Sequence, residues 1–270
     1  MSTLVAFHAH PDDECITTGG TLAKAVDDGH RVVVVYATRG EVGEAPDGLL
    51  SPGETLVDRR LDEVARSTAA LGVHRVEFLG YRDSGMMGTP DNDDPASFWR
   101  ADVSEAAARL AAILRDEHAA VLLTYDENGN YGHPDHVQVH RVGVRAAELA
   151  GTPQVLEATV NRDSIRAFVE HMVSSGDASW DDVPDLDDPD LVFGMPDAVI
   201  TTRVDVRPWA ERKLASMRAH ETQVGDLAPF LAMPLEIFRE TMGTEFFIRR
   251  GVPSDHRDDD VFAGVAPAPR

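Results

Sequence analysis

The chain contains 270 residues, of which 43% are hydrophobic and one is cysteine, and its formal net charge is −22. A chain of this length can bury a sizeable core without disulfide bonds, and because no signal-like segment precedes the first apolar run, we expect a cytoplasmic protein. The negative charge argues against nucleic acid or an anionic membrane surface as a partner, and no run approaches the roughly 20 apolar residues that span a bilayer.

Short apolar runs alternate with helical patterns along the chain. The runs predict strands over residues 4–8, 31–37, 75–80, 119–124, 154–160 and 198–203. Apolar residues at helical spacing predict helices over residues 18–28, 56–71, 102–117 and 134–150. This alternating order predicts an α/β fold with a Rossmann-like, mostly parallel sheet and helices on both of its faces.

The segments between and after these elements differ in composition. Two long connections, residues 39–55 and 81–101, are rich in turn residues and are expected to shape a pocket. Residues 177–190 are dominated by aspartate and are expected to form an acidic loop insertion. We therefore predict a single domain over residues 1–250 with a small C-terminal elaboration, and a flexible tail over residues 251–270.

Two clusters of histidine and aspartate come after predicted strands. Residues 8–14 read His-Ala-His-Pro-Asp-Asp-Glu at the end of the first strand, and residues 131–136 read Tyr-Gly-His-Pro-Asp-His after the fourth. In open α/β sheets, ligands bind in the crevice at the carboxyl ends of the strands. Two such clusters at that edge predict one metal site that is assembled from two loops.

Three residues of these clusters fit a catalytic metal centre. Zinc that performs chemistry keeps three protein ligands and one open position, and histidine with aspartate is within its usual set. His10, Asp13 and His136 meet this requirement. Such a site lowers the pKa of bound water and polarises a substrate carbonyl. We predict Zn²⁺ as the cofactor, with Fe²⁺ as an alternative because imidazole and carboxylate accommodate both ions.

The neighbouring residues indicate the remaining catalytic roles. Asp12 is expected to take the proton from water as general base. His133 is expected to act as general acid or oxyanion donor, with Asp135 orienting it. The alternative is that the two His-Pro-Asp turns only cap helices, because Asp and Pro are common at helix starts. The two interpretations are compatible, since the geometry of a helix start can also hold a ligand.

Together, the motifs at residues 10–14 and 133–136 resemble the paired signatures of the zinc-dependent N-deacetylase family known as LmbE-like or PIG-L. This family includes the N-acetylglucosaminyl-phosphatidylinositol deacetylases, the mycothiol-pathway deacetylase and the mycothiol conjugate amidase. The resemblance runs from residue 4 to about residue 223. It implies the LmbE-like deacetylase fold, with zinc on the three ligands named above. It also implies that Asp12 is the general base and that His133 assists the transition state or the leaving group.

The resemblance also implies residues that contact the substrate. Tyr131 is expected to contact the tetrahedral intermediate, although it could simply be a wall aromatic. Arg60 and Asp83 are expected to bind the sugar, the alternative being that they form surface ion pairs. His220 is expected near the pocket, or else as a helix-end histidine that pairs with carbonyl groups. Other segments are similar to the conjugate amidase, so the resemblance does not select one substrate.

We therefore expect a hydrolase that removes the N-acetyl group of an N-acetylglucosamine-containing glycoside, a small-molecule substrate. One alternative is amide cleavage of a thiol conjugate, as in the conjugate amidase. Others are a metal phosphoesterase, which commonly needs two ions and more carboxylates, and a nucleotide-binding regulatory module. Against the last, the first strand is not followed by a Gly-x-Gly-x-x-Gly turn. The sequence leaves oligomerisation open.

Overall fold

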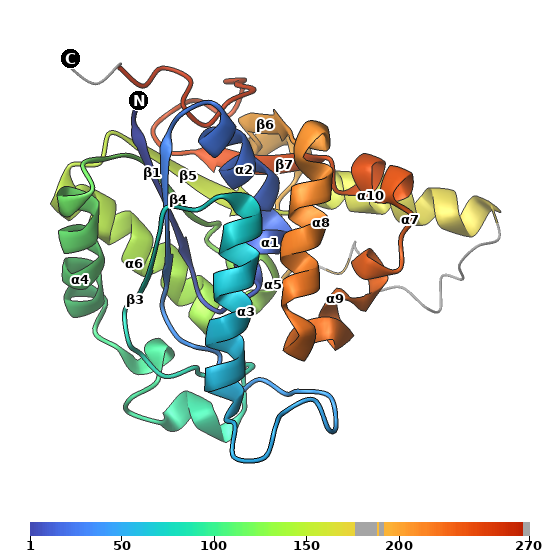
Figure 1. Cartoon of the computed structure of the whole chain (residues 1–270). Coiled ribbons are helices and arrows are strands. Elements are labelled where there is room, and N and C mark those ends of the chain that lie inside the picture. Colours follow the sequence, from blue (N-terminus) through green and yellow to red (C-terminus); the bar gives the residue numbers. More distant parts are fainter. Residues whose placement is uncertain (176–187, 189–191, 267–270) are drawn as a thin grey trace.

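The computed structural model describes residues 1–175, 188 and 192–266. Within these residues, seven strands form one mixed sheet of order β3-β2-β1-β4-β5-β7-β6 (Figure 1). The pairs among β1 to β5 are parallel, and β7 is antiparallel to both β5 and β6. The predicted Rossmann-like, mostly parallel sheet is therefore confirmed. The strands are β1 (Thr3–His8), β2 (Arg31–Tyr36), β3 (Arg75–Phe78), β4 (Ala119–Tyr125), β5 (Gln154–Thr159), β6 (Thr202–Asp205) and β7 (Thr244–Arg249).

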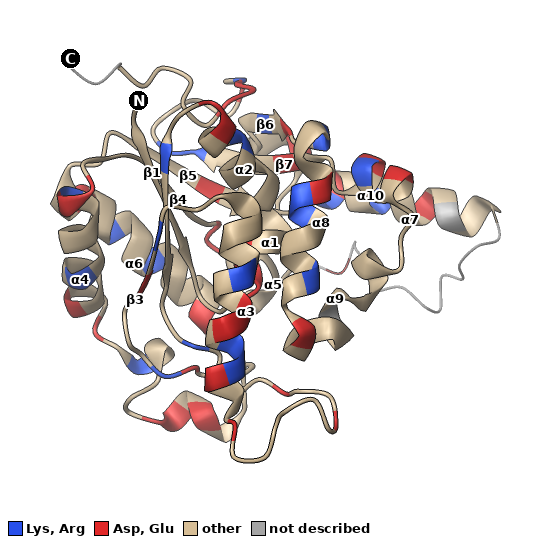
Figure 2. Ribbon diagram, in the orientation of Figure 1, with Lys and Arg blue, Asp and Glu red and all other residues tan. Residues whose placement is uncertain are grey.

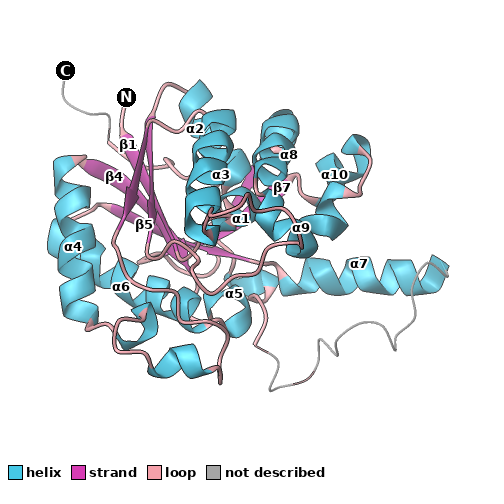
Figure 3. Ribbon diagram, turned by 60° about the horizontal axis from the view of Figure 1, so that its bottom comes forward, coloured by secondary structure: helices cyan, strands magenta, loops and turns pink. Residues whose placement is uncertain are grey.

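Helices cover both faces of this sheet (Figures 1 and 3). On one face α2 (Gly19–Asp27), α3 (Leu56–Leu71) and α8 (Ala210–Ala219) pack together. On the other face α4 (Val103–Asp116) packs against α6 (Pro134–Ala150). The remaining helices are α1 (Asp13–Thr17), α5 (Gly129–Gly132), α7 (Arg162–Ser175), α9 (Val224–Leu231) and α10 (Leu235–Thr241).

The central strands form the core because both of their faces are covered. β1 and β2 are buried almost throughout, with side chains such as Val5, Phe7 and Val34 inaccessible to solvent. Strands buried on both faces appear in sequence as continuous apolar runs, which is why β1 and β2 were predictable. The sequence did not predict β7, which lies between β5 and β6, because only Glu245 and Phe247 of this strand are buried and it lacks such a run.

Helix α3 matters for the site because its buried face carries Arg60 and Ser67 into the interior. The helix begins with a capping box, in which the backbone N–H of Asp58 donates to the Thr55 hydroxyl and the Asp58 carboxylate accepts from the Thr55 backbone, both at 3.1 Å. It ends at Gly72, whose φ of 76° suits glycine. These signals fix the ends of the helix at the predicted residues.

The segment after β7 packs on the sheet. Val261 is buried in the main core, and the Lys24 ammonium of α2 lies 2.5 Å from the Asp260 carboxylate. Part of residues 251–266 therefore contacts the rest of the described chain through the apolar side chain of Val261 and the acidic side chain of Asp260. The flexible tail over residues 251–270 stays a prediction.

Charged residues are distributed over many helices and loops of the fold. Figure 2 shows Asp and Glu on helices such as α3, α4 and α10 and on the loops around them, with Lys and Arg interspersed. The acidic insertion expected over residues 177–190 lies, apart from residue 188, outside the described residues. Among the helices that the structure describes, none is both long enough and apolar enough to cross a membrane.

Candidate active site

The two His/Asp motifs lie at the carboxyl ends of the neighbouring strands β1 and β4. These strands pair in parallel, with residues 4–6 opposite residues 121–123, so the loops that follow them leave the sheet at the same edge. β1 leads into α1, which begins at Asp13, and β4 leads through α5 into α6, which begins at Pro134. The fold thus brings together the motifs that the sequence places far apart.

His10, Asp13 and His136 surround one small space. The Oδ2 atom of Asp13 lies 3.6 Å from Nδ1 of His10, and its Oδ1 atom lies 3.3 Å from Nε2 of His136. The centroids of the two imidazole rings are 5.3 Å apart. All three residues are buried, so water screens the charges in this space only weakly. The three predicted ligands therefore lie within reach of a single ion.

His136 supplies a test of whether these residues fit a metal. Neither of its ring nitrogens has a hydrogen-bond partner among the described residues, although the side chain is buried. Buried polar atoms in proteins are normally paired. Here Nε2 faces the Asp13 carboxylate, and two imidazoles with one carboxylate are donors that Zn²⁺ and Fe²⁺ accept. The donor set and the unsatisfied nitrogen both fit a divalent metal.

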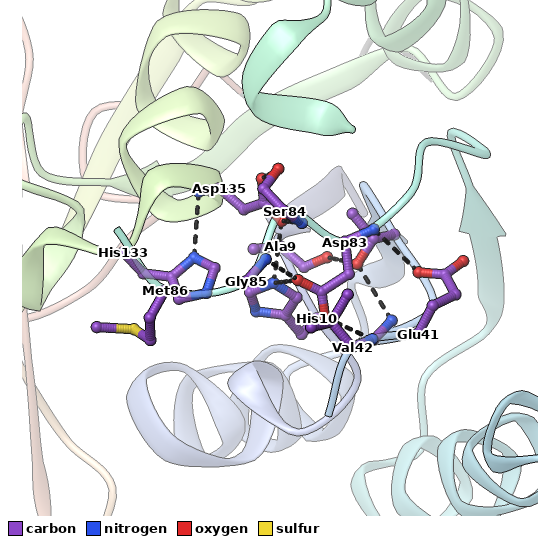
Figure 4. A network of polar contacts seen from close by, with 12 residues as sticks. Ala9, His10, Glu41, Val42, Asp83, Ser84, Gly85, Met86, His133 and Asp135 are labelled. Carbon is purple, nitrogen blue, oxygen red and sulfur yellow. Dashed lines mark hydrogen bonds and ion pairs between the residues drawn. The ribbon is translucent and has the colours of Figure 1, made fainter. Parts of the chain in front are cut away.

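The ring of His10 is oriented by acidic residues on its far side. Its Nε2 atom lies 3.2 Å from Oδ2 of Asp135 and 3.5 Å from Oδ1 of Asp83 (Figure 4). Asp135 in turn accepts hydrogen bonds from Ser84, one from its backbone N–H at 3.0 Å and one from its hydroxyl. A metal-binding histidine commonly donates its second N–H to a carboxylate in this way. As a result, Nδ1 of His10 faces Asp13.

The contacts of the Asp135 carboxylate differ from those that the sequence suggested. We expected its carboxylate to orient His133, but that carboxylate contacts His10 and Ser84. The link to His133 is through the backbone, because the N–H of Asp135 donates to Nδ1 of His133 at 3.1 Å. The first N–H groups of a helix have no partner within it, and His133 supplies one for α6. The motif thus caps a helix and also aims His136 at Asp13.

His133 lies beside the candidate ligands. Its ring centroid is 4.7 Å from that of His10 and 5.2 Å from that of His136, and one nitrogen from each of the three rings lies within 4.8 Å of the others. Burial, followed by the charges of His10 and His136, lowers the pKa of His133 to about 3. Because Nδ1 accepts a hydrogen bond, the proton of the neutral ring is on Nε2. His133 is therefore a neutral N–H donor.

Asp12 adjoins Asp13 but has different partners. Its backbone is left-handed, with a φ of 109°, which residues with a side chain seldom adopt. Its Oδ2 atom lies 3.1 Å from Nη2 of Arg60. Burial raises the pKa of Asp12 to about 6, and the charge of Arg60 opposes this rise. A carboxyl group with a pKa closer to neutrality is suited to accept a proton in catalysis.

Arg60 is buried and contacts acceptors of the protein itself. Its guanidinium donates to the backbone carbonyls of Pro11 at 2.6 Å and Gly40 at 3.0 Å, as well as to Asp12. Arg60 is only 3% exposed, and its guanidinium is held by these acceptors. It therefore orients the loop that contains Asp12. The ion pair with Asp12 is internal and does not lie on the surface, and the contact of Arg60 with a sugar stays a prediction.

Asp83 is likewise buried and engaged with the protein. Its carboxylate accepts from the backbone N–H of Gly85 at 2.9 Å and faces His10, and its own backbone N–H donates to Glu41 at 3.1 Å (Figure 4). Although burial opposes it, the charge of His10 holds the pKa of Asp83 well below the usual range for aspartate. In this structure Asp83 supports His10, and its contact with a sugar hydroxyl stays a prediction.

His220 lies behind the site. It is completely buried at the end of α8, and its Nε2 atom lies 2.7 Å from Oε1 of Glu14. Burial disfavours the charged imidazole, but the adjacent Glu14 carboxylate outweighs this effect and raises the pKa of His220. The residue is thus close to the metal motif, as expected, but it contacts Glu14 instead of an open pocket.

Tyr131 is the exposed member of the group. The residue is 45% exposed, and its ring approaches the His136 ring edge-on, with 4.9 Å between centroids. The backbone of α5 is irregular here, since Asn130 has a φ of 63° and Tyr131 a φ of −140°. This irregular turn places the tyrosine on the solvent side of the buried histidines. Its position is compatible both with the predicted contact to the substrate and with a role as a wall of the site.

Sequence reasoning gave no role to Glu14, Ser84 or Tyr125, which all contact the site. The Tyr125 hydroxyl lies 2.8 Å from Nδ1 of His8, and its ring centroid is 4.8 Å from that of His136. Each of these residues is polar and lies at a strand end or next to an assigned residue. That position was a usable signal, but only the folded chain shows which atoms they contact.

Comparisons with known proteins point to the same chemistry. The sequence model of the PIG-L family, described as GlcNAc-PI de-N-acetylase, matches residues 5–147, which include both motifs. A protein named 1D-myo-inositol 2-acetamido-2-deoxy-alpha-D-glucopyranoside deacetylase, from Acidothermus cellulolyticus, is 44% identical to this chain over 98% of it and 96% of the relative. The protein of the same name from Geodermatophilus obscurus is 41% identical over 97% of each chain.

The fold is also found among solved structures. The N,N'-diacetylchitobiose deacetylase from Pyrococcus horikoshii superposes with a TM-score of 0.60 at 21% identity, covering 98% of this chain and 87% of that chain. At this identity the likeness supports the fold alone. The sequence relatives reach further, because they are similar along nearly the whole chain. From the family match and these relatives, we conclude that the chain belongs to the PIG-L family of hydrolytic deacetylases.

Proposed function

We propose that this enzyme removes the acetyl group from 1D-myo-inositol 2-acetamido-2-deoxy-α-D-glucopyranoside and releases acetate and the free amine. The observation that supports the chemistry most strongly is the convergence of His10, Asp13 and His136 on one space beside Asp12. The choice of substrate rests on the relatives of 44% and 41% identity, whose names specify this glycoside.

In this proposal the three converging residues hold one divalent metal, zinc or alternatively iron. When bound there, the metal polarises the acetyl carbonyl and lowers the pKa of the attacking water. Asp135 and Asp83 keep the His10 ring turned so that Nδ1 faces Asp13. The buried surroundings keep other water away from these charges, so their interactions with the substrate remain strong.

Asp12 acts as the general base. Its carboxylate accepts a proton from the attacking water while the water oxygen bonds to the amide carbon. A pKa of about 6 leaves most of this carboxylate ionised at neutral pH, and Arg60 keeps it oriented. The proton then passes to the amine nitrogen as the carbon–nitrogen bond breaks. This transfer restores the Asp12 carboxylate.

His133 and Tyr131 stabilise the negative charge that develops on the acetyl oxygen. Donors that are fixed before the reaction contribute strongly to catalysis, because they need no reorganisation in the transition state. The backbone N–H of Asp135 fixes the His133 ring with its Nε2–H available to a ligand. Tyr131 lies on the exposed side of the histidines, from which the substrate approaches.

An assay with three substrates tests this proposal. The purified, metal-loaded protein is incubated separately with the inositol glycoside, with a bimane-labelled thiol conjugate that contains an amide bond, and with a phosphomonoester. The release of free amine, acetate and phosphate is measured. We expect metal-dependent release of amine and acetate from the glycoside. Faster cleavage of the conjugate identifies an amidase, and phosphate release with two metal ions per chain identifies a phosphoesterase. Either result, or no turnover of the glycoside, contradicts the proposal.

A further inference from the structure

We infer that Glu14, held by His220 and Ser67, positions the proposed general base Asp12. This inference rests on the function proposed above, but it concerns a buried network that the proposed mechanism does not use. Glu14 follows Asp13 in the first turn of α1 and is completely buried. Its two carboxylate oxygens divide their contacts, one toward Asp12 and the other toward helices α3 and α8.

The first set of contacts fixes the backbone of Asp12. The N–H of Asp12 donates to Oε2 of Glu14 at 3.0 Å. Its carbonyl accepts from the backbone N–H of Cys15 at 3.1 Å and from the Cys15 thiol at 2.8 Å. Both polar groups of the Asp12 backbone are therefore held while the residue has a φ of 109°. A left-handed conformation at a residue with a side chain persists when its surroundings enforce it.

The second set of contacts fixes Glu14. Its Oε1 atom accepts from the hydroxyl of Ser67 on α3 and lies 2.7 Å from Nε2 of His220 at the end of α8. The hydroxyl of Ser216, also on α8, lies 2.6 Å from the hydroxyl of Ser67. All four side chains are inaccessible to solvent. Two helices that are far apart in sequence thus converge on the carboxylate that holds Asp12.

The same helix α3 also controls the side chain of Asp12. Arg60, two turns before Ser67, places Nη2 3.1 Å from the Asp12 carboxylate. One rigid helix therefore fixes the carboxylate directly through Arg60 and the backbone indirectly through Ser67 and Glu14. A general base must lie within hydrogen-bond reach of the proton that it takes, and small displacements of such groups are costly in rate. An Arg60–Asp12 ion pair that served only stability would not require the backbone of Asp12 to be held by Glu14 as well.

Kinetics of a graded set of variants test the inference. We expect His220→Leu to lower kcat about 10–100-fold, as is typical when a group that orients an active-site residue is lost. KM and metal content should stay at wild-type values, because the metal ligands and the exposed side of the site are untouched. His220→Gln restores an N–H donor and should recover part of the loss. Ser67→Ala weakens the same network mildly, and it provides the test if His220→Leu does not fold.

Glu63 offers a matched control. It is a buried carboxylate one turn before Ser67 on α3, and it accepts from the backbone N–H of Thr222 at 2.9 Å and from its hydroxyl at 2.6 Å. Glu63→Gln should therefore lower the melting temperature without changing kcat. If Ser67→Ala and His220→Leu behave like this control, losing stability while keeping kcat, the inference is wrong.

Two further measurements separate positioning from a general structural effect. In an Asp12→Ala background, Ser67→Ala and His220→Gln should change the residual rate less than about twofold, because the group through which they act is gone. Equal losses in both backgrounds contradict the inference. A crystal structure of Ser67→Ala or His220→Leu gives a readout that needs no turnover. Asp12 should leave its left-handed conformation or lose its bond to Glu14, and an unmoved Asp12 counts against positioning. A wild-type protein without deacetylase activity would instead count against the proposed function.

Discussion

Nη2 of Arg60 lies 3.1 Å from Oδ2 of Asp12, the neighbour in sequence of the candidate ligand Asp13. This contact sets two effects against each other, since burial raises the pKa of Asp12 while the guanidinium lowers it. The resulting value of about 6 lies close to the pH at which a cellular enzyme works. The arginine thus affects both the position and the ionisation of the proposed base.

The pH dependence of catalysis follows from this pair. Asp12 is active as a base only when ionised, so kcat/KM should fall as the pH drops below about 6 and level off above it. Arg60→Met removes a charge that lowers this pKa, so the acidic limb should move to higher pH and the maximum should decrease. Profiles of kcat/KM for both proteins check this expectation. An acidic limb that stays in place in Arg60→Met would show that the arginine does not tune the base.

Replacement of the base itself should separate catalysis from metal binding. Asp12→Asn keeps the shape of the side chain but removes its ability to take a proton. We expect kcat to fall about 10²–10⁴-fold, the usual contribution of a general base, with the metal content unchanged. Elemental analysis of the purified variant provides the second measurement. If the variant loses its metal, or keeps its full rate, the role assigned to Asp12 is wrong.

Asp135 should influence metal affinity through His10. Asp135→Asn replaces the charged acceptor 3.2 Å from Nε2 of His10, and changes of this kind typically cost 10–100-fold in metal affinity or activity. Competition with a chelator measures the affinity. Asp102→Asn is a suitable control. The Asp102 carboxylate also accepts a hydrogen bond, from the backbone N–H of Glu105 at 2.9 Å, but it does so at the start of α4 and not beside His10. Equal metal affinities of the two variants would contradict the role of Asp135.

The two lysines of the chain should contribute unequally to stability. Lys213 lies 2.7 Å from Glu245 in a buried pair, and Glu245 also accepts from the backbone N–H groups at the start of α2. Lys213→Met leaves a buried carboxylate without its cation and should lower the free energy of unfolding by about 3–5 kcal/mol. Lys24→Met removes a more exposed pair and should cost less than about 1 kcal/mol. Denaturant unfolding of both variants checks this difference, and similar losses would contradict it.

The sequence predicted the sheet and the convergence of the motifs because both depend on strong local patterns. The runs that became β1, β2 and β4 are continuous and apolar, and the carboxyl ends of parallel strands share one edge. The motifs end these strands, so their meeting followed from topology. Strand β7 was missed because four of its six residues are exposed or only partly buried, so it lacks a continuous apolar run.

The directions of individual side chains were harder to predict. Asp135 was expected to face His133, but on α6 its carboxylate points to His10 and Ser84, while its backbone serves His133. Arg60 and Asp83 were expected to reach the substrate, yet both are buried against backbone groups of the loops that they hold. These outcomes depend on the relative placement of helices and loops, which residue spacing in one sequence does not specify.

The central claim is that His10, Asp13 and His136 hold one divalent cation. Anomalous diffraction from crystals of the zinc-loaded protein tests it most directly. We expect a single strong peak per chain, bounded by Nδ1 of His10, the Asp13 carboxylate and Nε2 of His136, which disappears in His136→Ala. A peak at another place, or a wild-type protein that binds no metal between these side chains, would show that these three residues do not form the metal site.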